Sequence, residues 1–241
     1  MNTDDQIKKS VNLPAADLPI AEEPEDFRSS IQWRIFRIMS EFIEGFQFLA
    51  DFKKTITIFG SARLQPDTHW YQEAQKLGRL LSKAGYGIVT GGGPGIMEAA
   101  NRGAVEGGKG DSIGLNIQLP NEQRVNPYVK KARGFHYFFS RKVMLSFSAE
   151  AYIYFPGGFG TLDEFFEIAT LIETRKISPI PIVLVGKDFW SPLTTWIEDD
   201  LLKRYKTIKG RDTYIYQVVD SAEEALAIVK KKAKGLPLSQ R

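Results

Sequence analysis

Cysteine is absent from the 241 residues of the chain, and histidine occurs only at His69 and His136. Without cysteine the protein has no disulfide bond, no thiolate metal site and no cysteine nucleophile. Two histidines also argue against a histidine-rich metal centre. We therefore expect a site that works without a metal and without a cofactor.

Long apolar runs are lacking as well. Residues 180–185 form one of the longest runs, far below the roughly 20 residues that cross a membrane. The N-terminus is acidic and has no apolar signal-peptide core. These absences predict a cytoplasmic protein that has no membrane partner.

An excess of one charge is also missing, because 32 Lys+Arg against 29 Asp+Glu leave a net charge of +3. This excess is too small to indicate a nucleic-acid partner. The C-terminal tail is locally basic, which we interpret as favourable charge at a helix end; a nucleic-acid contact is the less favoured alternative. The basic residues of the tail are Lys230, Lys231, Lys232, Lys234 and Arg241.

The chain has 43% hydrophobic and 25% charged residues, a globular balance, and its length suits one α/β domain with an added segment. We expect a flexible acidic lead-in at residues 1–26, a helix at 27–54, the main α/β domain at 55–235 and a short tail at 236–241. The lead-in carries Asp4, Asp5, Asp17, Glu22, Glu23, Glu25 and Asp26.

The helix expected at 27–54 is apolar on more than one side. One stripe at helical spacing holds Ile31, Ile35, Ile38, Met39, Phe42, Ile43 and Phe46, and Trp33, Phe36, Phe48 and Phe52 lie outside it. A helix of this kind is usually covered by its own core and by another subunit. We therefore expect a homodimer or a higher homo-oligomer; the alternative is a helix buried within a single chain.

From residue 55 onward, short β-rich runs alternate with helical patterns, as in a parallel sheet covered on both faces. We predict an α/β fold with a Rossmann-like, doubly wound, mostly parallel sheet and helices on both faces. The expected strands are residues 55–59, 86–90, 112–119, 151–155, 180–185 and 214–219. The expected helices are 67–83, 96–106, 140–148, 161–174, 189–204 and 222–232, and 120–134 is expected to be a polar loop.

Two glycine-rich turns, at residues 91–95 and 156–161, each lead from the end of a strand into a helix. Glycine lets a ligand approach the backbone, and a helix start offers unpaired N–H groups that suit a phosphate. Neither turn is the dinucleotide fingerprint, because Ile96 occupies the third glycine position. A phosphate-bearing ligand is expected; packing alone is the alternative for a single turn.

Glu164 has two interpretations. Thr161-x-x-Glu164 has the spacing of a capping box, in which both side chains bond to N–H groups at the start of a helix; on spacing alone we favour this structural role. The alternative is a functional carboxylate, whose repulsion of a phosphate would be offset by cations such as Arg141 and Lys142.

The run Pro156-Gly157-Gly158-Phe159-Gly160-Thr161-Leu162-Asp163-Glu164 resembles the PGGxGTxxE signature of the Lonely Guy family. These proteins are cytokinin riboside 5′-monophosphate phosphoribohydrolases, and many carry the label "possible lysine decarboxylase". Arg141-Lys142-x-Met144 is similar to the family's RKxxM element, and the turn at 91–95 is similar to its GGGxxGxM segment. The resemblance extends from about residue 55 to 229, whereas the sequence shows no pyridoxal-phosphate lysine context that would support a decarboxylase.

The resemblance implies hydrolysis of the N-glycosidic bond of a purine nucleoside 5′-monophosphate, AMP or an N6-substituted AMP. It implies that Arg141 and Glu164 are catalytic. The implied substrate-binding residues are Glu122, Lys142, Gly157, Gly158, Phe159, Gly160, Thr161, Leu162, Asp163 and Thr170, and further candidates are Ser61, Gly92, Gly93 and Glu98.

Three features depart from the family's short members: the first 54 residues, Glu98 at a helix start, and Phe138-Phe139 before the Arg-Lys element. They leave open which base is preferred, and whether the use is cytokinin production or nucleotide salvage. A non-catalytic carrier of a nucleotide or of molybdenum cofactor has a similar fold and is the main alternative, followed by a regulatory nucleotide sensor.

Overall fold

The computed structural model describes residues 30–118 and 125–233. The expected lead-in at 1–26, the tail at 236–241 and the candidate Glu122 lie outside the described residues. The chain divides into two units, Met1–Arg37 and Ile38–Arg241. The helix α1 (Ile31–Ala50) begins in the first unit, and everything that follows it belongs to the second.

The second unit is built around one seven-stranded sheet in which every pair of neighbouring strands is parallel. The central strand is fully buried, as expected of a parallel strand covered on both faces. In spatial order the strands are β4 (Lys131–Phe135), β3 (Ser112–Ile117), β2 (Gly87–Thr90), β1 (Thr55–Phe59), β5 (Tyr152–Tyr154), β6 (Ile182–Val185) and β7 (Tyr216–Val219).

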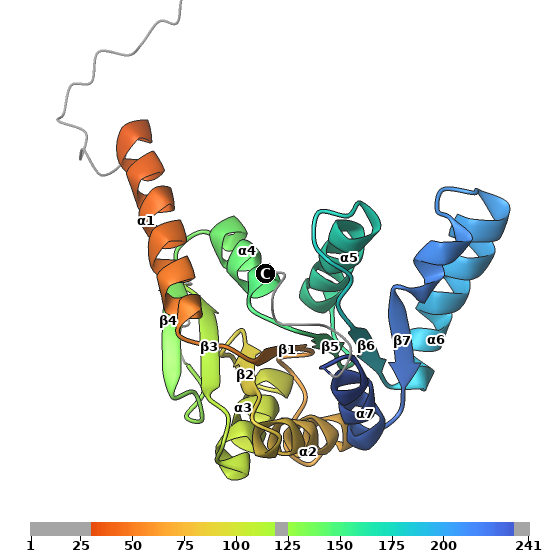
Figure 1. Ribbon diagram of the computed structural model, residues 1–241, viewed down its shortest axis with the longest axis horizontal. Helices are drawn as coiled ribbons and strands as arrows, with labels where there is room; N and C mark the ends of the chain where they lie inside the picture. Colours follow the sequence, from red (N-terminus) through yellow and green to blue (C-terminus); the bar gives the residue numbers. More distant parts are fainter. Residues whose placement is uncertain (1–29, 119–124, 234–241) are drawn as a thin grey trace, which may run out of the picture. The chain divides into compact units, whose positions relative to one another are not determined.

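Helices cover both faces of this sheet (Figure 1). On one face, Ile56 and Ile58 of β1 pack in an apolar cluster with α2 (His69–Lys83), α3 (Ile96–Gly107) and α7 (Ala222–Ala233). On the other face, Tyr152 and Tyr154 of β5 pack in a second cluster with α4 (Phe138–Phe147), α5 (Phe159–Glu173) and α6 (Lys187–Trp196). The doubly wound, Rossmann-like fold is therefore confirmed.

The prediction of a polar loop at 120–134 is wrong for the last part of this range, because Lys131–Phe135 is the edge strand β4. It pairs with β3 from Lys131 opposite Ile113 to Phe135 opposite Ile117. The strand was missed because an edge strand needs only one apolar side: Lys131 is exposed whereas Phe135 is fully buried. Charged residues on such a strand also discourage pairing with other chains.

Three smaller differences concern the last third of the chain. The helix expected at 189–204 begins earlier, at Lys187, and its second half, η3 (Ile197–Arg204), has the wider π-helical geometry. A short 3₁₀ helix, η4 (Gly210–Tyr214), precedes β7. None of the described helices is long and apolar enough to cross a membrane.

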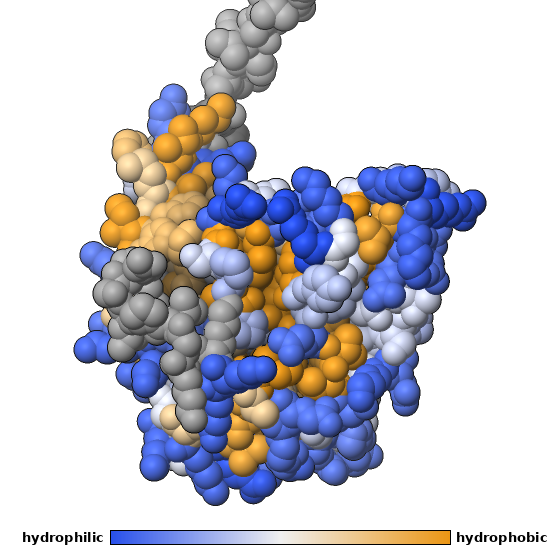
Figure 2. Space-filling view, turned by 45° about the vertical axis from the view of Figure 1, so that its right-hand side comes forward, coloured by the Kyte–Doolittle hydropathy of each residue, from blue (hydrophilic) through white to orange (hydrophobic). Residues whose placement is uncertain are grey.

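The helix expected at 27–54 is α1, and its apolar side chains are largely uncovered. Figure 2 shows hydrophobic residues gathered along this helix. The exposed apolar side chains are Ile31, Trp33, Ile35, Phe36, Met39, Ile43 and Phe46. Phe42 and Leu49 of the same helix are partly buried and pack against the cluster that holds α4 and α5.

Candidate active site

The order of the strands places both glycine turns at one point of the sheet. The chain winds outward from β1 in both directions, so the topology reverses between β1 and β5. In open parallel sheets, ligands bind outside the carboxyl ends of the strands at such a switch point. One glycine turn follows β2 and the other follows β5, the two neighbours of β1. The fold thus brings the two turns together.

Ser61, which follows β1, connects the two turns through its backbone. Its N–H donates to the carbonyl oxygen of Pro156 at 3.0 Å, and its carbonyl oxygen accepts from the N–H of Ile96 at 3.0 Å. Gly95 has a φ of +69°, and a Cβ at this position would collide with the Ser61 carbonyl. Glycine is required here for its conformation and for this close approach.

The turn after β5 leads into α5 with its backbone open to a ligand. Phe159 is 93% exposed, and a Cβ added at Gly158 or Gly160 would have nothing within 4 Å among the described residues. At Gly157, by contrast, a Cβ would collide with the side chain of Thr161. The first N–H groups of α5 lie at this bare turn, where a helix has no internal partners for them.

The capping box proposed for Thr161 and Glu164 is wrong. α5 begins at Phe159 with Gly158 as its N-cap, and within the described part of the chain no side chain caps it. Thr161 is therefore the third residue inside the helix, and its N–H donates to the carbonyl oxygen of Gly158 at 3.0 Å. The sequence misled because glycine lets the chain enter the helix two residues before the threonine.

Glu164 is a buried carboxyl group whose hydrogen-bonding capacity is not used. It is 5% exposed, and its Oε2 has no hydrogen-bond partner among the residues that the structure describes. Burial raises its pKa from 4.5 to about 7; the charges of Lys142 and Arg141 oppose this rise, and those of Glu167 and Asp163 add to it. A carboxyl group with a pKa near neutrality can hold or release a proton at physiological pH.

Arg141 faces this carboxyl group from the first turns of α4. Burial lowers the pKa of its guanidinium group, and the charge of Glu164 opposes that effect. Its Nε is buried without a hydrogen-bond partner in the described ranges, and the guanidinium carbon lies 5.9 Å from the ring centroid of Phe138. A half-buried guanidinium group with an unused donor suits an anionic or oxygen-rich ligand.

Lys142 connects α4 to α5 through two carboxylates. Its Nζ lies 2.8 Å from Asp163 Oδ2 and 3.0 Å from Glu167 Oε2. Burial lowers the pKa of Lys142, but the contacts with Asp163 and Glu167 outweigh it and the pKa is raised. Lys142 therefore stays protonated and partly neutralises the acidic face of α5.

Hydrogen bonds with Thr90 and Asn126 fix the turn after β2. The N–H of Gly92 donates to Thr90 Oγ1 at 2.9 Å. Asn126 donates its own N–H to the carbonyl oxygen of Gly92 at 2.9 Å, and its Nδ2 to the carbonyl oxygen of Gly93 at 3.0 Å. These bonds fix the shape of the turn through Gly92 and Gly93.

The other candidates are placed as follows. Ser61 Oγ accepts from the N–H of Arg63 at 3.1 Å. Glu98 Oε1 accepts from the hydroxyl of Tyr71 at 3.0 Å, which holds α3 against α2. Thr170 is exposed two turns beyond Asp163 on α5, and Leu162 is partly buried against the apolar cluster beneath α4 and α5.

Sequence reasoning missed two residues at this place. Glu167 follows Glu164 by three residues, so helical spacing already puts both on one face of α5, and this signal could have been used. No such signal pointed to Asn126, because its hydrogen bonds to Gly92 and Gly93 join residues that are distant in the sequence.

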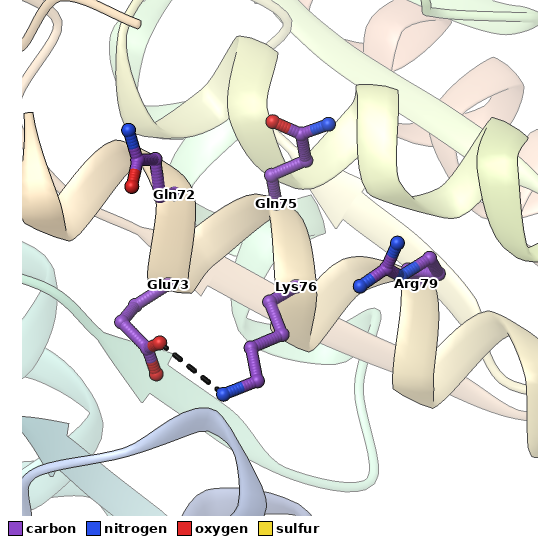
Figure 3. Close-up of a pocket in the computed structure, with 5 residues that line it drawn as sticks. All are labelled: Gln72, Glu73, Gln75, Lys76 and Arg79. Atoms are coloured by element: carbon purple, nitrogen blue, oxygen red, sulfur yellow. Dashed lines mark hydrogen bonds and ion pairs between the residues drawn. The ribbon is translucent and has the colours of Figure 1, made fainter. Parts of the chain in front are cut away.

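A hollow on the outer side of α2 is unrelated to these turns. Figure 3 shows the side chains that line it and an ion pair along the helix, with Lys76 Nζ 3.4 Å from Glu73 Oε1. The lining residues are Gln72, Glu73, Gln75, Lys76 and Arg79. All lie on one helix, and none belongs to the glycine turns or to the carboxyl and guanidinium groups described above.

Known proteins share this sequence pattern. The model of the family described as "Possible lysine decarboxylase" matches residues 97–229. A cytokinin riboside 5′-monophosphate phosphoribohydrolase from Rhodococcoides fascians is 26% identical over 183 residues, covering 73% of this chain and 89% of its own. A probable enzyme of the same name from Oryza sativa subsp. japonica is 33% identical over 129 residues, covering 52% and 51%.

Solved structures agree on the fold. The molybdenum cofactor carrier protein from Chlamydomonas reinhardtii has a TM-score of 0.57 at 22% identity, covering 76% of this chain and 99% of that one. At this identity the likeness concerns the fold alone. The family match spans more than half of the 241 residues. The chain therefore belongs to the possible lysine decarboxylase family, the family of the Lonely Guy phosphoribohydrolases.

Proposed function

We propose that the protein hydrolyses the N-glycosidic bond of a purine nucleoside 5′-monophosphate, AMP or an N6-substituted AMP, to the free base and ribose 5-phosphate. The observation that carries this proposal is the pair of the half-buried Arg141 and the buried Glu164 beside the open glycine turn of α5. Each keeps a buried polar atom without a partner among the described residues. The names of the relatives support the same reaction class.

The phosphate is proposed to bind at the turn after β5. The start of α5 offers N–H groups and the positive end of the helix dipole, and the open space at Gly158 and Gly160 lets an anion reach the backbone. The side chain of Thr161 is buried beneath Gly157. We therefore assign Thr161 to the shape of the turn, and the phosphate contacts to the backbone.

The reaction breaks the bond between C1′ of the ribose and the nitrogen of the base. The electron pair of this bond leaves with the base, and the ribose passes through a state that resembles an oxocarbenium ion. The ionised carboxylate of Glu164 stabilises this positive charge and accepts a proton from the water that attacks C1′. The departing base takes up one proton from the solvent, and Glu164 afterwards releases the proton of the attacking water to the solvent. The products are therefore neutral base and ribose 5-phosphate, and Glu164 is ionised again.

Arg141 is proposed to bind phosphate or ribose oxygens and to keep Glu164 ionised. Its positive charge lowers the pKa of Glu164 against the effect of burial. Orientation of this kind contributes strongly to catalysis, up to roughly 7–11 kcal/mol in intramolecular analogues. The two side chains come from different helices, α4 and α5, whose packing sets their relation.

The test is to incubate the purified protein with AMP, and separately with adenosine, and to follow adenine and ribose 5-phosphate by chromatography. We expect both products from AMP and none from adenosine, because the phosphate positions the ribose. Adenosine and inorganic phosphate as products would mean a phosphatase and would contradict the proposal.

A carrier that binds a phosphate-bearing cofactor without turnover is the second candidate, since the similar folds include molybdenum cofactor carrier proteins. Retention of an unhydrolysed nucleotide, or of a pterin that co-purifies, would favour it. The pair of Arg141 and the buried Glu164 favours the hydrolase, because a carrier of an anion gains nothing from a carboxylate beside its anion site.

A further inference from the structure

The helix that carries Arg141 has no cap of its own. α4 begins after Tyr137, and in the described part of the molecule the Tyr137 side chain makes no capping hydrogen bond. The first N–H groups of a helix need partners from elsewhere, and an uncapped start frays. Arg141 lies in the first turns of α4, where its N–H donates to the carbonyl oxygen of Tyr137 at 3.3 Å.

A carboxylate from α1 binds the two residues that lead into α4, of which Tyr137 is the N-cap residue. Glu41 Oε1 accepts from the N–H of His136 at 2.7 Å, and Glu41 Oε2 accepts from the N–H of Tyr137 at 3.3 Å. The same oxygen accepts a hydrogen bond from the hydroxyl of Ser140. A negative charge at a helix N-terminus is also favoured by the helix dipole.

This contact is buried, and neighbouring contacts support it. Glu41 is 8% exposed, so loss of its carboxylate would leave buried donors without partners. One turn along α1, Gly45 lies directly against the side chain of Met144 on α4. All of these residues belong to the second unit of the chain.

We propose that Glu41 is a positioning residue that sets the place of Arg141 relative to Glu164, and that the N-terminal helix thereby takes part in the active site. This inference rests on the proposed function. Glu41 holds the three residues before and at the start of α4, and Arg141 follows directly after Ser140. A displacement of about 1 Å of a catalytic group can cost on the order of 100-fold in rate.

The test is a double-mutant cycle that combines Glu41→Ala with Arg141→Ala, read as kcat/KM for AMP. In the wild-type background, we expect Glu41→Ala to lower kcat/KM by about 10- to 100-fold. In the Arg141→Ala background, the same change should cost less than about twofold, because Glu41 acts through Arg141. An equal loss in both backgrounds would show a general structural role and overturn the proposal.

The matched control is Glu44→Ala, which removes another carboxylate from α1. Glu44 pairs with Arg133 of β4 and does not cap α4, so this variant should keep its kcat/KM. Glu41→Gln serves if the alanine variant does not fold: it retains an acceptor for one donor, loses the charge and should show an intermediate loss. If the alanine variant does not fold, an unchanged kcat/KM in Glu41→Gln would overturn the proposal.

The failure of the proposed function is distinguished by a second readout in the same variants. The affinity for AMP, measured by calorimetry, reports on Arg141 even without turnover. If the wild type binds AMP but releases no adenine, the hydrolase proposal fails, and the cycle of binding constants still decides on Glu41. If Glu41→Ala weakens AMP binding in the wild-type background but not in the Arg141→Ala background, the positioning role is supported. If Glu41→Ala weakens AMP binding equally in both backgrounds, the positioning role is refuted.

Discussion

The hydroxyl of Tyr154 donates a hydrogen bond of 3.1 Å to the backbone carbonyl oxygen of Glu164. Tyr154 is the last residue of β5 and is fully buried, and its ring stacks on Phe59 of β1 with centroids 5.0 Å apart. The central sheet thus holds α5 at the residue that carries the carboxyl group. The position of Glu164 is fixed by its backbone, which leaves its side chain free to act.

Replacement of Tyr154 tests this relation. Tyr154→Phe keeps the ring stack and removes one buried hydrogen bond, so we expect a loss of about 1 kcal/mol in the free energy of unfolding. The kcat for adenine release should fall severalfold, because α5 gains freedom at Glu164. The change is measured by urea unfolding and steady-state kinetics; an equally active variant would show that packing alone holds the helix.

The difference in stability between the wild type and Glu164→Gln should depend on pH in a way that identifies the buried carboxyl group. The pKa of Glu164 in the folded protein, about 7, lies above its ordinary value of 4.5. The folded state therefore holds the proton more tightly, and this contribution to stability is full below pH 4.5 and is lost as the pH rises through 7. Glutamine has no such loss.

We accordingly expect Glu164→Gln to be more stable than the wild type above pH 7, by up to about 3 kcal/mol, and the two proteins to converge toward pH 5. Melting temperatures measured at several pH values check this expectation. A gap that stays constant between pH 5 and 8 would mean that the carboxyl group is not buried as described.

Arg141→Ala should abolish most turnover without unfolding the protein. Transition-state contacts of one charged group are typically worth 100-fold or more, so we expect a loss of at least about 100-fold in kcat/KM. Because Arg141 lowers the pKa of Glu164, the residual activity should also show its rise at a higher pH. The control is Arg204→Ala, which removes an exposed ion-pair partner of Asp200. A large fall in melting temperature in Arg141→Ala, but not in Arg204→Ala, would show that Arg141 has a structural role.

The exposed apolar side of α1 is proposed to bind a second copy of the chain. Ile43 is 56% exposed although it is a large apolar residue, and grouped exposed apolar residues mark interaction surfaces. Ile43→Glu should shift the protein to monomers in size-exclusion chromatography with light scattering. Arg37→Glu, on the polar side of the same helix, should not; an unchanged mass for Ile43→Glu would place the interface elsewhere.

The sequence was informative where a local pattern determines the structure. Short apolar runs between helical patterns predicted the strands, because a buried parallel strand is apolar on both faces. Glycine marked the two turns; at Gly95, for example, only glycine fits the backbone beside Ser61. The order of the strands in the sheet then brings these turns together, and that order was not predicted from the sequence.

Other features could not be predicted because they depend on residues distant in the chain. Glu41 binds the residues that lead into a helix that begins 97 residues later, at Phe138, and nothing in the spacing around Glu41 indicates this. The capping box at Thr161 failed for the opposite reason: a local pattern was present, but Gly157 and Gly158 moved the start of the helix. The raised pKa of Glu164 likewise follows from burial that only the packed helices create.

The most direct measurement is the pH dependence of kcat/KM for adenine release from AMP, compared between the wild type and Glu164→Gln. We expect the wild-type value to rise as the pH increases through about 7, because the ionised carboxylate is the active form. Glu164→Gln should be slower by at least about 100-fold and should lack this rise. A glutamine variant that releases adenine at the wild-type rate with the same pH profile would contradict the assignment of Glu164 as the catalytic carboxylate.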